Sequence, residues 1–205
     1  MNDKSIDINQ RIPLDVLHIA LEAYLNDNYS NDYIMEQLRL EFNGENRLKK
    51  ALRIVNLIIV KNPILSLIED KEALKLAIKK KPDRDIILIA FLNSAFPFSF
   101  EVLKIFGKFF AVQEIINADI VKKSISNIYG GNRATENGLY SVVPMFLEAG
   151  FFVRPKQGIY QWGRKIECNF EISRKIFLDS FKINNNIDKI LDYQLLDPYF
   201  NFLEV

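Results

Sequence analysis

The chain has 205 residues and 49% of them are hydrophobic, so it can bury a core either as one domain or as two small ones. Its one cysteine, Cys168, excludes an internal disulfide framework and fits a reducing cytoplasm. With only one histidine beside that cysteine, the chain also lacks the usual ligand set of a zinc site.

The net charge of +1 conceals an uneven distribution along the chain. Residues 118–165 carry seven basic and three acidic side chains, a net charge of +4, which leaves −3 on the rest. Local positive charge favours a polyanionic partner, because binding releases condensed counterions. A solvated basic face is the alternative interpretation of the same excess.

Neither a signal peptide nor a membrane span is predicted. Residues 1–13 lack a basic stretch followed by an apolar one. The most apolar run, 86–112, contains Pro97 and three charged residues, whereas a span needs about 20 predominantly apolar residues. We therefore expect a soluble cytoplasmic protein without a membrane partner, in which this run forms two buried helices that meet at Pro97.

Hydrophobic periodicity predicts a helical N-terminal body. The expected helices span 13–25, 32–42 and 45–60. Ser30 or Asn31 is a suitable cap for the second helix. The third helix should stop before Asn62-Pro63, because a residue that precedes proline disfavours the helical region.

Three further helical segments follow in the body. Residues 63–80 should form one or two short helices, closed by the charged stretch before Pro82. Asp85 is expected to cap or begin a helix over 86–96, and Ser99 to cap one over 100–110. Phenylalanines recur at helical spacing in the latter segment, so we assign them to core packing in preference to a ligand pocket.

The segment 118–162 has the order of elements of a winged helix-turn-helix. A first helix is expected over 119–129, and Gly130-Gly131 provides the turn, since glycine adopts left-handed backbone angles at little cost. Two short aromatic-rich runs within 151–162, joined by a basic turn, predict a β-hairpin that serves as the wing.

The second helix of this module should begin at Ala134 or Thr135 and end at Ala149, before Gly150. Pro144 interrupts the pattern, because proline lacks the N–H donor and clashes with the preceding turn. We expect it either to kink this helix or to begin a separate one.

Suitable DNA-contacting groups cluster in this module. Arginine can bridge the acceptors of guanine and asparagine can pair with adenine, whereas lysine suits phosphates. The candidate DNA-binding residues are Lys122, Lys123, Asn132, Arg133, Thr135, Asn137, Tyr140, Arg154, Lys156, Gln157 and Arg164. The alternative is that residues 130–138 form a plain polar loop, with Arg133 solvated or paired to Glu136.

Beyond residue 162 we expect a strand or a return to the helical body, then a helix near Ser173–Phe181 and a polar break at 184–186. The predicted fold class is mainly α, a helical N-terminal body with a C-terminal winged helix-turn-helix that carries a short β-hairpin. The expected divisions are a helical domain (1–113), the winged module (114–165) and a helical extension (166–205) that packs on the body.

The residue inventory favours a protein that is not an enzyme. His18 lies inside an amphipathic helix, where a structural role is the simpler interpretation. No phosphate-binding glycine motif is present, and no acidic cluster with a lysine suggests a nuclease. We expect no catalytic residues, no cofactor and no metal.

The succession of parts resembles the BrxA family of BREX phage-defence systems over roughly residues 25–155. It comprises a helical body, a basic amphipathic helix with an Asn-Pro (RLKKALRIVNLIIVKNP), an apolar helical pair and a helix-turn-helix ending in LEAGFF. The resemblance implies a non-enzymatic, mostly helical DNA-binding component of a defence locus, with protein partners from a defence complex. The chain departs from the pattern in its Gly-Gly-Asn-Arg turn and in Pro144.

Two functions from different classes follow. The first is binding of duplex DNA by the winged module without catalysis. The second is a protein–protein adaptor, in which the aromatic residues Phe151, Phe152, Tyr160 and Trp162 dock a partner, because aromatic side chains are enriched at such interfaces.

Overall fold

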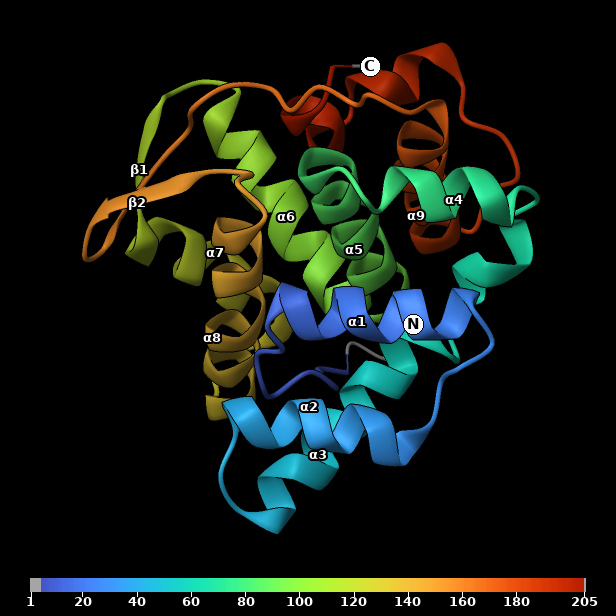
Figure 1. The fold of residues 1–205 in the computed structure, drawn as a ribbon. Helices are drawn as coiled ribbons and strands as arrows, with labels where there is room; N and C mark the ends of the chain where they lie inside the picture. The colour runs from blue at the N-terminus through green and yellow to red at the C-terminus, as the bar shows by residue number, and fades with distance from the viewer. Residues whose placement is uncertain (1–4, 205) are drawn as a thin grey trace.

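The computed structural model describes residues 5–204, so the prediction made on residues 1–13 lies partly outside the described residues. Within that range the chain is mainly helical and carries a small three-stranded antiparallel sheet at one side (Figure 1). The mainly α fold class is confirmed at this level.

The N-terminal body begins with three helices, α1 (Leu14–Leu25), α2 (Asn31–Glu41) and α3 (Glu45–Ile59). The Ser30 hydroxyl accepts the Tyr33 N–H at 3.2 Å and caps α2. The helix α3 stops ahead of Asn62, and Pro63 then opens the 3₁₀ helix η1 (Pro63–Leu67). All three predicted helices are confirmed.

Two predicted helix starts are wrong. The next helices are α4 (Lys71–Ala77), α5 (Lys81–Ala95) and α6 (Pro97–Phe110). Pro82 lies in the first turn of α5, where its missing N–H costs nothing, so it opens this helix instead of closing the preceding segment. Asp85 is buried inside α5 and pairs with Lys81 and Arg84. Pro97 likewise opens α6, which places Ser99 inside that helix.

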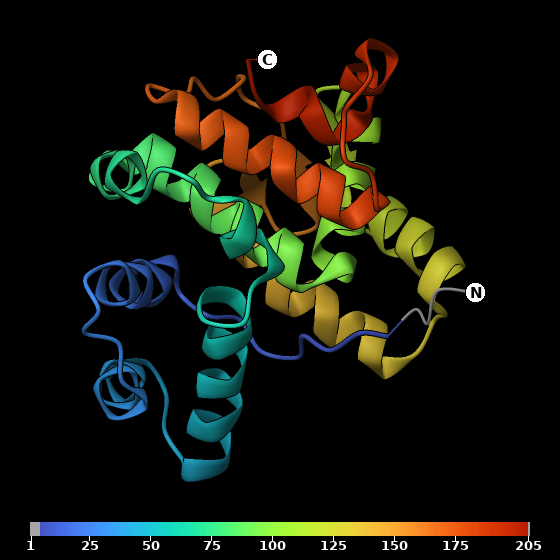
Figure 2. The same cartoon turned by 90° about the vertical axis from the view of Figure 1, so that its right-hand side faces the viewer.

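The C-terminal segment packs on the centre of the molecule. Helix α9 (Glu171–Asn185) lies along α5, and the 3₁₀ helix η3 (Pro198–Phe202) lies along α6, after η2 (Asp192–Leu196). Figure 2 shows α9 on the opposite side of α5 from α1 and α3. The expected helix near Ser173–Phe181 is therefore confirmed and is longer than predicted. For the residues between 162 and α9, a strand or a return to the helical body was expected. The strand-like feature found there is an isolated bridge between Ile166 and Leu203.

A buried polar cluster stands where α5, α6, α9 and η3 meet. The Tyr199 hydroxyl accepts a hydrogen bond from the Asn93 amide at 3.0 Å and lies 2.6 Å from the Ser180 hydroxyl. Ser99 donates to the side-chain carbonyl oxygen of Asn93 at 2.6 Å. Burial raises the pKa of the Tyr199 phenol above its ordinary value. The cluster satisfies these polar groups inside an otherwise apolar core.

The remaining elements lie in residues 114–165, the segment for which a winged helix-turn-helix was predicted. They are β1 (Ile115–Asn117), α7 (Ala118–Tyr129), α8 (Arg133–Glu148), β2 (Val153–Lys156) and β3 (Ile159–Gln161). The strand order is β1-β3-β2, with Ile116 opposite Tyr160. The hairpin β2–β3 is confirmed, whereas β1 was not predicted.

One hydrophobic core joins all three predicted segments, since a single cluster of buried residues runs from Ile8 to Leu203. Helix α6 contacts the body, the elements of residues 114–165 and the C-terminal segment. At Gly107 a Cβ atom would overlap the backbone carbonyl of Pro198, so the absence of a side chain allows η3 to lie against α6. Within residues 5–204, none of the helices combines the length and the apolar character that crossing a membrane requires.

Candidate nucleic-acid interface

The turn between α7 and α8 is fixed by local hydrogen bonds. Gly130 follows α7 with φ +88°, a backbone conformation that favours glycine. The Asn132 side chain accepts the Thr135 N–H at 3.1 Å and so caps α8, which begins at Arg133, one residue earlier than predicted. The Thr135 hydroxyl donates to the Gly130 carbonyl at 2.6 Å. Residues 130–138 are thus a capped turn and a helix start, not a plain polar loop.

Thr135 does not present its hydroxyl to solvent. The residue is 1% exposed and its hydroxyl is engaged with the turn. Its role is to hold the helix start, and the prediction that its hydroxyl contacts DNA is wrong. The sequence could not distinguish a hydroxyl that faces solvent from one that bonds a nearby backbone carbonyl, because both are common near a helix start.

Three of the candidate residues form one exposed stripe at the start of α8. Arg133, Asn137 and Tyr140 are spaced by four and three positions, which places them on one face of the helix. All three are exposed, and the Tyr140 side chain is 73% exposed. We call these residues the α8 stripe. It offers a guanidinium, an amide and a phenol to one side of the molecule.

Contacts at two places along α8 hold it on the helical body, and only the first lies on the face opposite the α8 stripe. Gly138 packs so closely that a Cβ there would lie 2.6 Å from the Phe98 ring and 2.8 Å from the Ile6 side chain. Near the end of the helix, the Glu148 carboxylate accepts the Leu14 N–H at 2.8 Å and pairs with Arg11 at 2.6 Å. These contacts fix the direction in which the α8 stripe points.

Pro144 does not begin a separate helix, because α8 continues through it to Glu148. Because Pro144 has no N–H group, the carbonyl of Tyr140, the last residue of the α8 stripe, lacks its usual helical hydrogen bond from residue 144. Of the two expectations for Pro144, the restart is wrong. Gly150, at φ +76°, occupies the left-handed position expected after the helix.

The tip of the hairpin is exposed and basic. Residues 153–157 are all exposed, among them Arg154, Lys156 and Gln157. The Ala118 N–H donates to the Gly158 carbonyl at 2.8 Å, and β1 pairs with β3, so the hairpin is fixed to the start of α7. The Arg154 guanidinium lies 6.0 Å from the centroid of the Tyr160 ring, within cation–π range.

The aromatic residues of the hairpin belong to the core. Phe151 and Phe152 are each 1% exposed, and Phe152 stacks on Phe106 with ring centroids 4.2 Å apart. Tyr160 is 9% exposed and Trp162 is half-buried. The prediction that these four rings form a docking surface is therefore wrong. The sequence gives the positions of aromatic residues but does not show whether they face the core or the solvent.

The lysines of α7 differ in their surroundings. Lys122 pairs with Glu136 across the α7–α8 angle at 2.6 Å. The hydrogen bond from Lys122 lowers the pKa of the Glu136 carboxyl and raises the pKa of the ammonium. The partner of Glu136 is thus Lys122, and the alternative pairing with Arg133 is wrong. Lys123 is exposed on α7, and Arg164 is exposed in the segment after β3.

A groove brings four of the predicted residues together. It has a volume of about 290 Å³ and lies between α7, α8 and the hairpin. The predicted residues that line it are Lys122, Tyr140, Arg154 and Gln157. Asn132, Arg133, Lys123, Lys156 and Arg164 do not line the groove. The α8 stripe and the basic tip thus meet at its rim through Tyr140 and Arg154.

A second cavity, on the other side of the α8 stripe, was not predicted. It has a volume of about 420 Å³ and is formed by α8, the segment before α1 and the α2–α3 connection. Arg47 is its basic residue on α3. The sequence signal for this cavity is the basic run RLKK at residues 47–50, because it indicates a basic surface on the helix that it belongs to.

The groups set aside as catalytic or metal-binding are dispersed. His18 lies half-buried on α1, where burial and then Arg84 lower its pKa. Burial raises the pKa of the Cys168 thiol to about 11, and the nearby Asp83 acts in the same direction. In the part of the chain that the structure describes, no three His, Cys, Asp or Glu residues gather as a metal site would require. No family model, curated protein or solved structure matches this chain.

Proposed function

We propose that this protein binds duplex DNA, without catalysis, through a winged helix formed by α6, β1, α7, α8 and the hairpin β2–β3. The observation that carries the proposal is that Tyr140, at the end of the exposed α8 stripe, lines one groove together with Arg154 and Gln157 of the exposed hairpin tip. A helix start that presents polar side chains beside a basic hairpin suits a major groove and its flanking phosphates.

The roles of the residues follow from their chemistry. Arg133 and Asn137 are the groups suited to base edges, and Lys123, Lys156 and Arg164 suit phosphates. Lys122 is held by Glu136, so a phosphate would have to replace that carboxylate. The excess of basic side chains in residues 118–165 supports a polyanionic partner.

We also propose the cellular system in which this protein acts. The resemblance to the BrxA family supports a component of a bacterial phage-defence system that acts in the cytoplasm and works with protein partners. It rests on the order of the helical elements, the basic helix α3 and the LEAGFF end of α8.

Neutralising the hairpin tip tests the proposal. For the Lys156→Gln and Arg154→Gln variants we expect the slope of log K against log salt to become shallower by about 1 for each phosphate that is no longer neutralised. An electrophoretic shift assay on a fixed duplex across salt concentrations measures this slope. Lys189→Gln, an exposed lysine after α9, is the matched control and should bind as the unmodified chain does. Absence of any shift at low salt contradicts DNA binding.

The second candidate function is that of a protein–protein adaptor, with a docking surface made of other residues than the four aromatic rings predicted from the sequence. The groove is partly apolar, with Leu139, Val143 and Leu147 on the α8 side and the exposed ring of Tyr140 at its rim. A stoichiometric partner that stays bound in nuclease and moderate salt, and that is lost in Tyr140→Ala, would favour this function over DNA binding. Loss of the partner on nuclease treatment would argue for DNA instead.

A further inference from the structure

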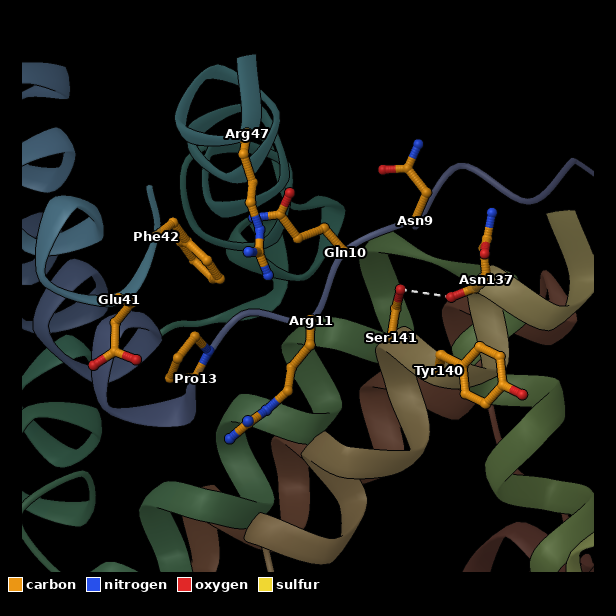
Figure 3. Close-up of a pocket in the computed structure, with 10 residues that line it drawn as sticks. All are labelled: Asn9, Gln10, Arg11, Pro13, Glu41, Phe42, Arg47, Asn137, Tyr140 and Ser141. Atoms are coloured by element: carbon orange, nitrogen blue, oxygen red, sulfur yellow. Dashed lines mark hydrogen bonds between the residues drawn. The ribbon is translucent and has the colours of Figure 1, made fainter. Parts of the chain in front are cut away.

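The second cavity lies directly beside the α8 stripe. Figure 3 shows Asn137, Tyr140 and Ser141 of α8 on one side of it and Phe42 and Arg47 on the other. The segment before α1 crosses between them and contributes Gln10. A ligand on the α8 stripe that extends toward α3 would therefore pass over this cavity.

Arg47 is available to an anion. It is exposed on α3, and its guanidinium lies 4.8 Å from the centroid of the Phe42 ring. Within residues 5–204 this guanidinium has no ion pair and no hydrogen bond. The other arginine of the cavity, Arg11, is already paired with Glu148 at 2.6 Å. Arg47 is thus the cation of this cavity that has donors to offer.

Gln10 supplies a second donor at the same place. It is 9% exposed, and its buried amide nitrogen has no hydrogen-bond partner in the described part of the chain. Figure 3 shows the Gln10 amide and the Arg47 side chain directed toward one another, while the Glu41 carboxylate points away from the guanidinium. Because a buried donor without a partner is unfavourable, an acceptor oxygen placed between these two groups would satisfy both.

The rest of α3 extends the positive charge away from the cavity. Between residues 45 and 61 there are five basic side chains and one acidic side chain. The basic side chains are all exposed, namely Arg47, Lys49, Lys50, Arg53 and Lys61. The acidic one, Glu45, lies 3.8 Å from Arg39, which is outside this set. Lys61 follows the end of α3, whereas Arg47 and Lys50, three positions apart, lie on neighbouring parts of one face. Exposed cations placed side by side in this way favour an extended polyanion over a single small anion.

We propose that duplex DNA bound at the α8 stripe continues across the second cavity onto α3. In this arrangement a backbone phosphate accepts hydrogen bonds from Arg47 and Gln10, and the next phosphates along the strand lie against Lys50 and its neighbours. This inference rests on the proposed function and adds to it a second contact surface outside the winged module. It assigns Arg47 to positioning the duplex, since phosphate contacts carry no base sequence information.

The full-length Arg47→Gln variant tests the inference with the same duplex and salt series. We expect the log K against log salt slope to become shallower by about 1, so that the decrease in affinity between about 50 and 200 mM salt shrinks roughly fourfold. Lys50→Gln should act in the same direction. Arg174→Gln, an exposed arginine on α9, is the matched control and should leave the slope unchanged.

The outcomes separate this inference from the proposed function. If Lys156→Gln weakens binding while Arg47→Gln and Lys50→Gln match the unmodified chain, the duplex does not reach α3 and the inference is wrong. If the unmodified chain does not shift the duplex at low salt, the proposed function itself fails. Thermal melting of each variant checks that the fold is unchanged, and because both residues are exposed we expect no loss of stability.

Discussion

At the scale of single residues, the absence of a side chain at Gly138 decides how α8 lies on the body. A Cβ there would come within 3 Å of both Phe98 and Ile6, closer than neighbouring atoms tolerate. Only a glycine lets the two surfaces meet at this distance. The direction of the α8 stripe therefore depends on a residue of the opposite helix face.

Gly138→Ala should lower the free energy of unfolding by about 1–3 kcal/mol, the usual cost of overpacking a tight interface. It should also weaken DNA binding, because α8 must shift to relieve the overlap. Denaturant unfolding measures the first effect, and the shift assay measures the second. Gly163→Ala is the control, since a Cβ at that position meets nothing within 4 Å. Equal stability of the two variants would contradict the packing argument.

Residue types predicted the candidate site only in part. Gly130 forms the predicted turn, because left-handed backbone geometry is a local property, whereas the Asn132 side chain, predicted as a DNA contact, caps α8. Arg133 is exposed as a DNA contact requires. Thr135 is buried although its residue type suits DNA, because burial depends on what the rest of the chain places over a side chain. The cavity at Arg47 does not follow from the local sequence, since the amide beside Arg47 comes from a segment far away in the sequence.

At the scale of elements, α8 contains a proline in its interior, at Pro144. An interior proline costs about 3 kcal/mol relative to alanine in a helix, because a hydrogen bond is missing and the ring clashes with the preceding turn. The surrounding packing maintains the helix in spite of this cost, since Val143 and Met145 on either side are buried.

Pro144→Ala should therefore raise the free energy of unfolding by about 1–3 kcal/mol, because it restores the donor for the Tyr140 carbonyl. DNA affinity should remain within about twofold, since α8 keeps its direction on the body. Thermal or denaturant unfolding gives the first quantity and the shift assay the second. A variant less stable than the unmodified chain would show that the proline ring fills the groove in a way alanine cannot replace.

Helices were easier to predict than strands, for physical reasons. Apolar periodicity predicted α1 to α3, and Ser30 predicted the start of α2. Asp85 and Ser99 are residue types that commonly cap helices, but α5 begins at Lys81 and α6 at Pro97, so both residues lie inside their helices. Strand β1 has three residues, of which only Ile116 is buried, so it has no recognisable alternation by itself. It exists because β3, more than 40 residues later, supplies its hydrogen-bond partners.

At the scale of the whole molecule, the continuous core predicts one cooperative unit. Residues 114–165 pack against α6, which also belongs to the body, and α9 and η3 cover α5 and α6. Unfolding followed by the fluorescence of Trp162, which stands after β3, should coincide with unfolding followed by helical circular dichroism. Two separate midpoints would instead favour independent domains with boundaries near 113 and 165.

The buried carboxylate of Asp83 has a consequence for the order in which the chain assembles. Asp83 lies in the first turn of α5, yet it accepts the N–H groups of Asn169 and Phe170 at 3.0 Å each, and so anchors the residues just before α9 to a distant part of the sequence. Closing so long a loop is slow compared with local helix formation, so α5 can form before α9 is anchored. We therefore expect α9 to form late, so that weakening the Asp83 contacts should change how quickly the folded protein opens more than how quickly it folds.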